Sequence, residues 1–152
     1  MKNSLLLLTC AFITIAGYAQ TTKFSKNAEE LEQKMRDWTA KKGYRLAVKF
    51  ELQNHASFYA QPYQDYAVFY IYDVDPNVPM DFKAYLMTPS DSLKEKYTAK
   101  PAEIAVKGTA GAQVVSFSTN KKMIGGAPKL PVKLEASPKA KMYVYRKNRK
   151  EA

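Results

Sequence analysis

The chain is poor in the residues that build covalent or metal-linked sites. It has one cysteine, Cys10, and one histidine, His55. Cys10 lies inside an N-terminal apolar run, where a cysteine behaves as a small hydrophobic residue. The remainder of the chain therefore offers no disulfide, no thiolate zinc site and no cysteine nucleophile, and one histidine without thiolates does not make a typical zinc site. The sequence predicts no metal, no cofactor and a fold stabilised by an ordinary hydrophobic core.

Catalytic motifs are also absent. Ser118-Thr119-Asn120-Lys121 has the Ser-x-x-Lys spacing of penicillin-binding acyltransferases but lacks their companion motifs. The segment Asp73–Asp81 begins with the alternating oxygens of a calcium loop but lacks its glycine and final glutamate, so we interpret it as a β-turn. No residue is predicted to be catalytic, and the sequence favours a protein that is not an enzyme.

Long apolar runs are missing except at the N-terminus. Lys2 is followed by an apolar run over residues 5–15 and by the small residues Gly17 and Ala19. This pattern is typical of a secretory signal peptide cleaved between Ala19 and Gln20, and the run is too short to span a membrane. A lipoprotein is the alternative, but Thr9 stands before Cys10 where a lipobox has Gly, Ala or Ser. We expect residues 1–19 to be removed.

The chain that remains, residues 20–152, has the length of a single globular domain and no transmembrane segment. The expected location is the bacterial cell envelope, either the periplasm or the medium after secretion.

The first element predicted is a helix. Asn27 and Glu30 have the spacing of a capping box, and Leu31, Met35 and Trp38 form one apolar stripe. Gly43 is placed to end the helix.

Strands are predicted to follow. Residues 44–53 alternate between apolar and polar side chains, as in a half-buried strand. Residues 66–74 are apolar on both faces, which indicates a central strand covered on two sides. Turn residues, among them Ser137-Pro138, separate the strands and indicate an antiparallel meander, and residues 90–97 could form a short helix. The other strands are expected at residues 82–87, 103–107, 113–118, 132–136 and 142–146.

This pattern predicts an α+β fold, with one N-terminal helix packed on a largely antiparallel β-sheet of about six or seven strands. The alternative is a β-sandwich with an N-terminal helix.

Positive charge is concentrated in the last fifth of the chain. Residues 121–152 hold 10 basic and 2 acidic residues, within a net charge of +10 for the whole chain. One interpretation is a surface for anionic lipid or polysaccharide; the other is a solvated surface that protects strand edges. Lysine outnumbers arginine by 20 to 4, which favours the second, because arginine suits phosphate recognition better. The candidate basic residues are Lys121, Lys122, Lys139, Lys141, Arg146 and Lys147.

Aromatic residues gather between residues 58 and 72. Tyrosines on a strand face can bind sugar rings or a partner's apolar side chains, but aromatic residues are also common in strands as core residues. Tyr66, Tyr70 and Tyr72 are expected on one face, whereas Tyr59 and Tyr63 are expected in a loop and exposed. All five are candidate binding residues.

These observations predict a small exported, non-catalytic binding protein whose partner is a protein or glycan of the envelope. Nucleic acid is not expected, because the chain is exported. One alternative is an inhibitor or immunity protein that blocks an exported enzyme. Another is a glycan hydrolase that uses two carboxylates, for which the candidates are Asp65, Asp73, Asp75 and Asp81.

Overall fold

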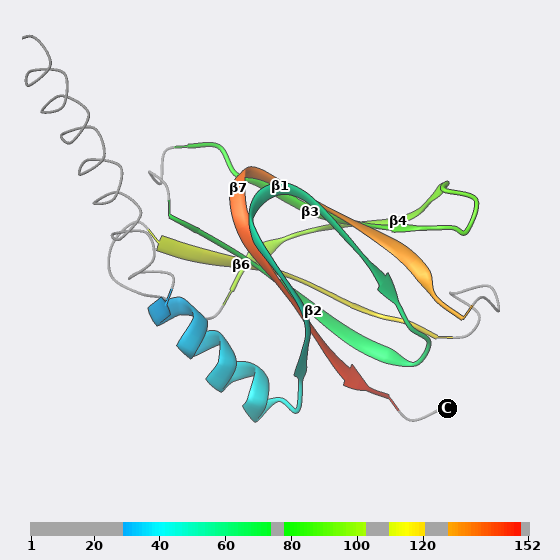
Figure 1. Ribbon diagram of the computed structural model, residues 1–152, viewed down its shortest axis with the longest axis horizontal. Coiled ribbons are helices and arrows are strands. Elements are labelled where there is room, and N and C mark those ends of the chain that lie inside the picture. The colour runs from blue at the N-terminus through cyan, green and yellow to red at the C-terminus, as the bar shows by residue number, and fades with distance from the viewer. Residues whose placement is uncertain (1–28, 74–77, 103–109, 121–127, 150–152) are drawn as a thin grey trace, which may run out of the picture.

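The computed structural model describes residues 29–73, 78–102, 110–120 and 128–149. Within these ranges the chain forms one helix, over residues 29–41, and seven antiparallel strands (Figure 1). The strands are β1 (Arg45–Ala60), β2 (Gln64–Asp73), β3 (Asp81–Met87), β4 (Leu93–Thr98), β5 (Lys100–Pro101), β6 (Ala110–Ser118) and β7 (Leu130–Asn148). The predicted signal peptide, residues 1–19, lies outside the described residues.

The helix confirms the predicted apolar stripe. Leu31 and Met35 are fully buried against the sheet, and the Trp38 ring meets the Phe69 ring edge-on at a centroid distance of 5.7 Å. Gly43 follows the last turn with φ of 82°, a left-handed conformation that glycine adopts without steric cost. The predicted cap, Asn27, lies outside the described residues.

The last strand, β7, organises the sheet. Along one edge it pairs with β1 over nearly its whole length. Along the other edge its first half pairs with β3 and its second half with β2. The sheet therefore has two halves that share β1 and β7, and it curves into a nearly closed barrel (Figure 1). Strands that pass from one half to the other through bends and bulges make such corners possible.

Two apolar clusters hold this arrangement together. The larger cluster fills the space between the two halves, with residues from β1, β2, β3, β6 and β7. The smaller cluster lies between the helix and the outer face of β2, β6 and β7. Because β2 contributes to both clusters, the prediction that it is a central strand covered on two sides is confirmed.

Three predictions about the strands are wrong. Residues 132–136 and 142–146 belong to one strand, because the residues around Ser137-Pro138 form a bulge opposite Asn54 of β1 instead of a turn. The Asn54 side-chain amide donates to the Ala136 carbonyl at 2.8 Å and bridges this bulge. The order β4-β3-β7-β2-β6-β5 is not a meander. The region of residues 90–97 contains β4 in place of a helix, and the strand expected at 103–107 lies outside the described residues.

The side chain of Tyr72 lies so close to Gly111, its partner on the neighbouring strand, that only glycine fits at this position. A Cβ at position 111 would lie 2.6 Å from the Tyr72 Oη, and the Tyr72 ring is stacked on Phe82 at 5.4 Å. Gly111→Ala should therefore push the ring off Phe82 and lower the free energy of unfolding by about 1–3 kcal/mol, as overpacking does. Urea denaturation of this variant measures the loss, and in a Tyr72→Ser background the same change should have little effect. An equal loss in both backgrounds would contradict this explanation.

Candidate functional site

The tyrosines of β2 lie mainly in the core. Tyr66 and Tyr70 are 1% and 0% exposed, and Tyr72 is partly buried. All three belong to the cluster between the two sheet halves, so they share one face as expected. The Tyr66 hydroxyl accepts a hydrogen bond from the Gln61 backbone N–H at 2.8 Å, and the Tyr70 hydroxyl donates to the Lys83 carbonyl at 2.7 Å. Burial leaves Tyr66 and Tyr70 no surface for a partner, and their side chains serve the core.

Tyr59 and Tyr63 are more accessible, but they lie in different structures. Tyr59 is 59% exposed and belongs to β1, so the prediction of a loop at this residue is wrong. The Lys129 ammonium lies over the Tyr59 ring at 4.6 Å. Tyr63 is half-buried in the short turn between β1 and β2, with φ of 54°.

The predicted basic residues do not form one patch. Lys121 and Lys122 lie outside the described residues. Lys139 is exposed and Lys141 half-buried in the middle of β7, whereas Arg146 and Lys147 lie near the end of this strand. Arg146 follows Lys139 by seven positions, which corresponds to roughly 23 Å along an extended strand. Of the four predicted basic residues that the structure describes, only Arg146 and Lys147 therefore lie at the same end of β7.

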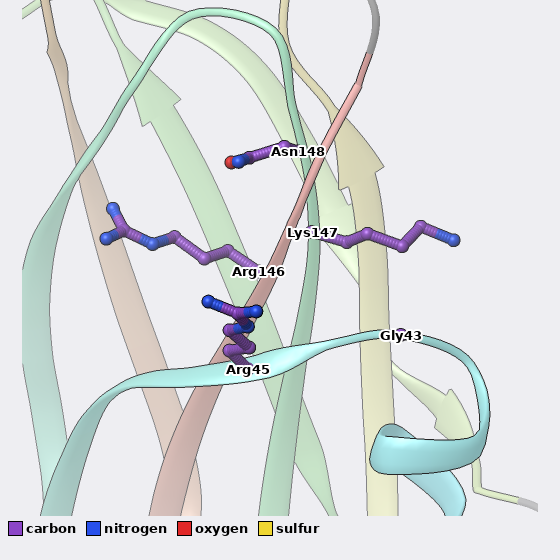
Figure 2. Close-up of a pocket in the computed structure, with 5 residues that line it drawn as sticks. All are labelled: Gly43, Arg45, Arg146, Lys147 and Asn148. Atoms are coloured by element: carbon purple, nitrogen blue, oxygen red, sulfur yellow. The ribbon is translucent and has the colours of Figure 1, made fainter.

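These two residues line a cleft with a volume of about 350 Å³. Its other lining residues are Gly43 after the helix, Arg45 at the start of β1 and Asn148 at the end of β7. We call this site the basic cleft. Figure 2 shows Arg146 and Asn148 extending to one side of β7 and Lys147 to the other, with Arg45 next to Arg146.

Arg45 and Arg146 are direct partners in the pairing of β1 with β7. Like charges directly opposite each other on neighbouring strands are destabilising. Six ion pairs join residues within the described ranges, and none of them includes Arg45 or Arg146. Among the residues that the structure describes, no carboxylate pairs with either of these two neighbouring guanidinium groups, and a bound anion would stabilise such an arrangement.

The Arg146 side chain is held in place from the β1–β2 turn. One of its terminal nitrogens donates to the Gln61 Oε1 at 3.0 Å. Burial raises the pKa of the Tyr66 hydroxyl, while the Gln61 N–H and the neighbouring Arg146 lower it in part. The Gln61 carbonyl in turn accepts a hydrogen bond from the Thr119 hydroxyl at 2.5 Å. The backbone N–H and carbonyl of Gln61 are therefore both held by hydrogen bonds, and the Gln61 side chain in turn positions Arg146.

The opposite side of β7 has its own contacts. The Lys147 ammonium lies over the Tyr44 ring at 5.0 Å and donates to the Lys42 carbonyl at 3.3 Å. Burial, followed by the negative charge of Asp65, raises the pKa of Tyr44. Asp65 accepts from the Ser118 hydroxyl at 2.5 Å and pairs with Arg149 at 3.4 Å. Lys147 therefore connects the end of β7 to the residue that follows the helix. It also contributes positive charge to the cleft from the side of β7 opposite to Arg146.

The candidate carboxylates do not form a hydrolase pair around Asp65. Asp65 and Asp73 stand near opposite ends of β2, roughly 26 Å apart along the strand, whereas glycosidase carboxyl groups lie about 5–9.5 Å apart. Asp81 is paired with Lys83 at 2.8 Å, and Asp75 lies outside the described residues. Among the residues that the structure describes, no three His, Cys, Asp or Glu side chains are grouped so that they could hold a metal ion.

The sequence identified only part of this cleft. It singled out Arg146 and Lys147 from the charge of the C-terminal region, but it missed Arg45 and Asn148, which line the cleft, and Gln61, which contacts Arg146. Arg45 lies about a hundred residues before Arg146 in the sequence, and only the register of β1 on β7 brings the two together. The one available signal was the composition: three of the four arginines of the chain, Arg45, Arg146 and Arg149, lie at this end of the sheet.

No protein family, no curated protein and no solved structure matches the chain significantly. In the described part of the chain, the single helix is too short and too polar to cross a membrane.

Proposed function

We propose that the protein is an exported, non-catalytic binding module that holds an anionic group in the basic cleft. The observation that carries this proposal is the Arg45–Arg146 cross-strand pair, which has no acidic partner in the described ranges. Two guanidinium groups offer paired N–H donors in the planar geometry that suits carboxylate and phosphate oxygens. The signal-peptide pattern of residues 1–19 supports export.

The fold supports this role by giving the cleft a rigid base. We assign the domain to the α+β class, because the helix covers one face of a continuous sheet and has its own apolar cluster. The arginines project from paired strands, and a site built on strands is held more accurately than one built on loops.

Arg45→Gln tests the proposal with inorganic phosphate as the probe. We expect this variant to bind phosphate at least about 10-fold more weakly, because a hydrogen bond to a charged group contributes about 1.5–3 kcal/mol. The measurement is isothermal titration calorimetry at low ionic strength, where exposed charges are least screened. Without phosphate the variant should be as stable as the original protein or slightly more stable, because the like-charge pair is gone.

Lys139→Gln is the matched control, since it removes one positive charge from an exposed site on the same strand. It should keep the phosphate affinity within about 2-fold if the cleft is the site. Equal weakening by Lys139→Gln and Arg45→Gln would mean that the protein attracts anions only through its overall charge. Failure of the original protein to bind phosphate at all would contradict an anion site.

A further inference from the structure

Side-chain amides accompany the arginines of the basic cleft. Asn148 lines the cleft and extends to the same side of β7 as Arg146 (Figure 2). Gln61 reaches Arg146 from the β1–β2 turn, with its Oε1 3.0 Å from the Arg146 nitrogen. Both amide side chains belong to exposed residues. The site therefore combines fixed positive charge with groups that both donate and accept hydrogen bonds.

We infer that the anionic group bound in the basic cleft is carried by a sugar, so that the ligand is an acidic sugar or a glycan that contains one. This inference rests on the proposed function. An amide offers two N–H donors and a carbonyl acceptor, and a sugar hydroxyl can satisfy either, because it also donates and accepts. A bare phosphate or carboxylate presents mainly acceptor oxygens and would leave the side-chain carbonyl of Asn148 unmatched, whereas the side-chain carbonyl of Gln61 already accepts from Arg146.

The position of Gln61 is prepared before any ligand arrives. Its backbone N–H donates to the buried Tyr66 hydroxyl at 2.8 Å, and its carbonyl accepts from the Thr119 hydroxyl at 2.5 Å. Its side-chain oxygen accepts from Arg146, which leaves the amide N–H groups for a ligand. Little conformational freedom remains to be lost at this residue on binding, and such preorganisation increases affinity.

The size of the cleft agrees with this ligand class. A volume of about 350 Å³ lies at the lower end of the range for small-ligand sites. The same chemistry fits a uronic acid, whose charge is a carboxylate attached to the sugar ring, and a sugar phosphate. Both carry the anion next to hydroxyl groups, and their affinities distinguish the two sources.

The test compares each anion with and without its sugar, using the full purified protein and calorimetry. The probes are acetate against glucuronate, and inorganic phosphate against glucose 6-phosphate, with glucose as the neutral control. We expect the better sugar-linked anion to bind at least about 10-fold more tightly than its bare counterpart, and glucose to bind far more weakly than either. The pair with the larger gain identifies the carboxylate or the phosphate as the charged group.

Gln61→Leu and Asn148→Leu separate the roles of the amides and the arginines. Each variant should lose most of the sugar-dependent gain, measured as the ratio of its affinity for the sugar-linked anion to its own affinity for the bare anion. Gln33→Leu, which removes an exposed amide from the helix, is the matched control and should change neither affinity. If the bare anions bind as tightly as their sugar forms, the sugar assignment is wrong and the anion site stands. If no charged probe binds, the proposed function fails as well.

Discussion

Phe82→Ala is expected to lower the free energy of unfolding by about 3–5 kcal/mol, the usual loss when a buried phenylalanine is truncated. Phe82 is 1% exposed in the cluster between the two sheet halves. The rings of Tyr70 and Tyr72 stack on it at centroid distances of 5.2 and 5.4 Å. Truncation therefore removes the ring that joins β3 to β2 across the core, and it leaves a cavity lined by two aromatic side chains that cannot collapse into it.

Urea denaturation followed by circular dichroism measures this loss. Phe82→Leu should lose less than the alanine variant, because it keeps most of the apolar volume. Leu93→Ala is the surface control: Leu93 is 57% exposed on β4, and its truncation should stay within about 0.5 kcal/mol. A loss below about 1 kcal/mol for Phe82→Ala would show that the two sheet halves do not depend on this contact.

Local features of this fold could be predicted from the sequence because they depend on neighbours in the chain. The helix follows from the spacing of Leu31, Met35 and Trp38, and its end follows from Gly43. The two-sided apolar pattern of residues 66–74 correctly indicated a central strand. The information lies in a period of 3.6 residues for the helix, in one glycine for its end, and in a nearly continuous apolar run for the central strand.

Features that depend on distant pairing could not be predicted. Ser137-Pro138 has the composition of a turn, but β1 and β7 are long enough to pair across it, with Asn54 bridging the bulge. The same long pairing places the last strand in the centre of the sheet. The candidate site has this limitation too. Arg146 could be identified from the basic segment, whereas Arg45 reaches the cleft only through strand register and Gln61 contacts Arg146 only through the geometry of the β1–β2 turn.

Alkaline pH is expected to destabilise the protein progressively above about pH 10. Burial, followed by the charges of Glu135 and Tyr85, raises the pKa of the Tyr70 hydroxyl far above its usual range, and burial also raises the pKa of Tyr66. In the unfolded chain both hydroxyls ionise near pH 10. Above this pH the native state therefore binds more protons than the unfolded state, and the free energy of unfolding falls as pH rises. Below pH 10 the contribution of these residues is fully present.

The slope expected from Tyr70 alone is about 1.4 kcal/mol for each pH unit above 10, because one proton separates the two states there. Urea denaturation at intervals between pH 8 and pH 11.5 measures it.

Tyr70→Phe loses the hydrogen bond to the Lys83 carbonyl and should be less stable at neutral pH, yet its stability should fall less steeply in alkali. The matched control is Tyr59→Phe, at a residue 59% exposed, which should keep the original slope. If the free energy of unfolding falls equally steeply with pH in Tyr70→Phe and in the original protein, the Tyr70 hydroxyl must become accessible to water without global unfolding. The nearly closed barrel would then be looser between β2 and β3 than the packing of Tyr70 on Phe82 implies.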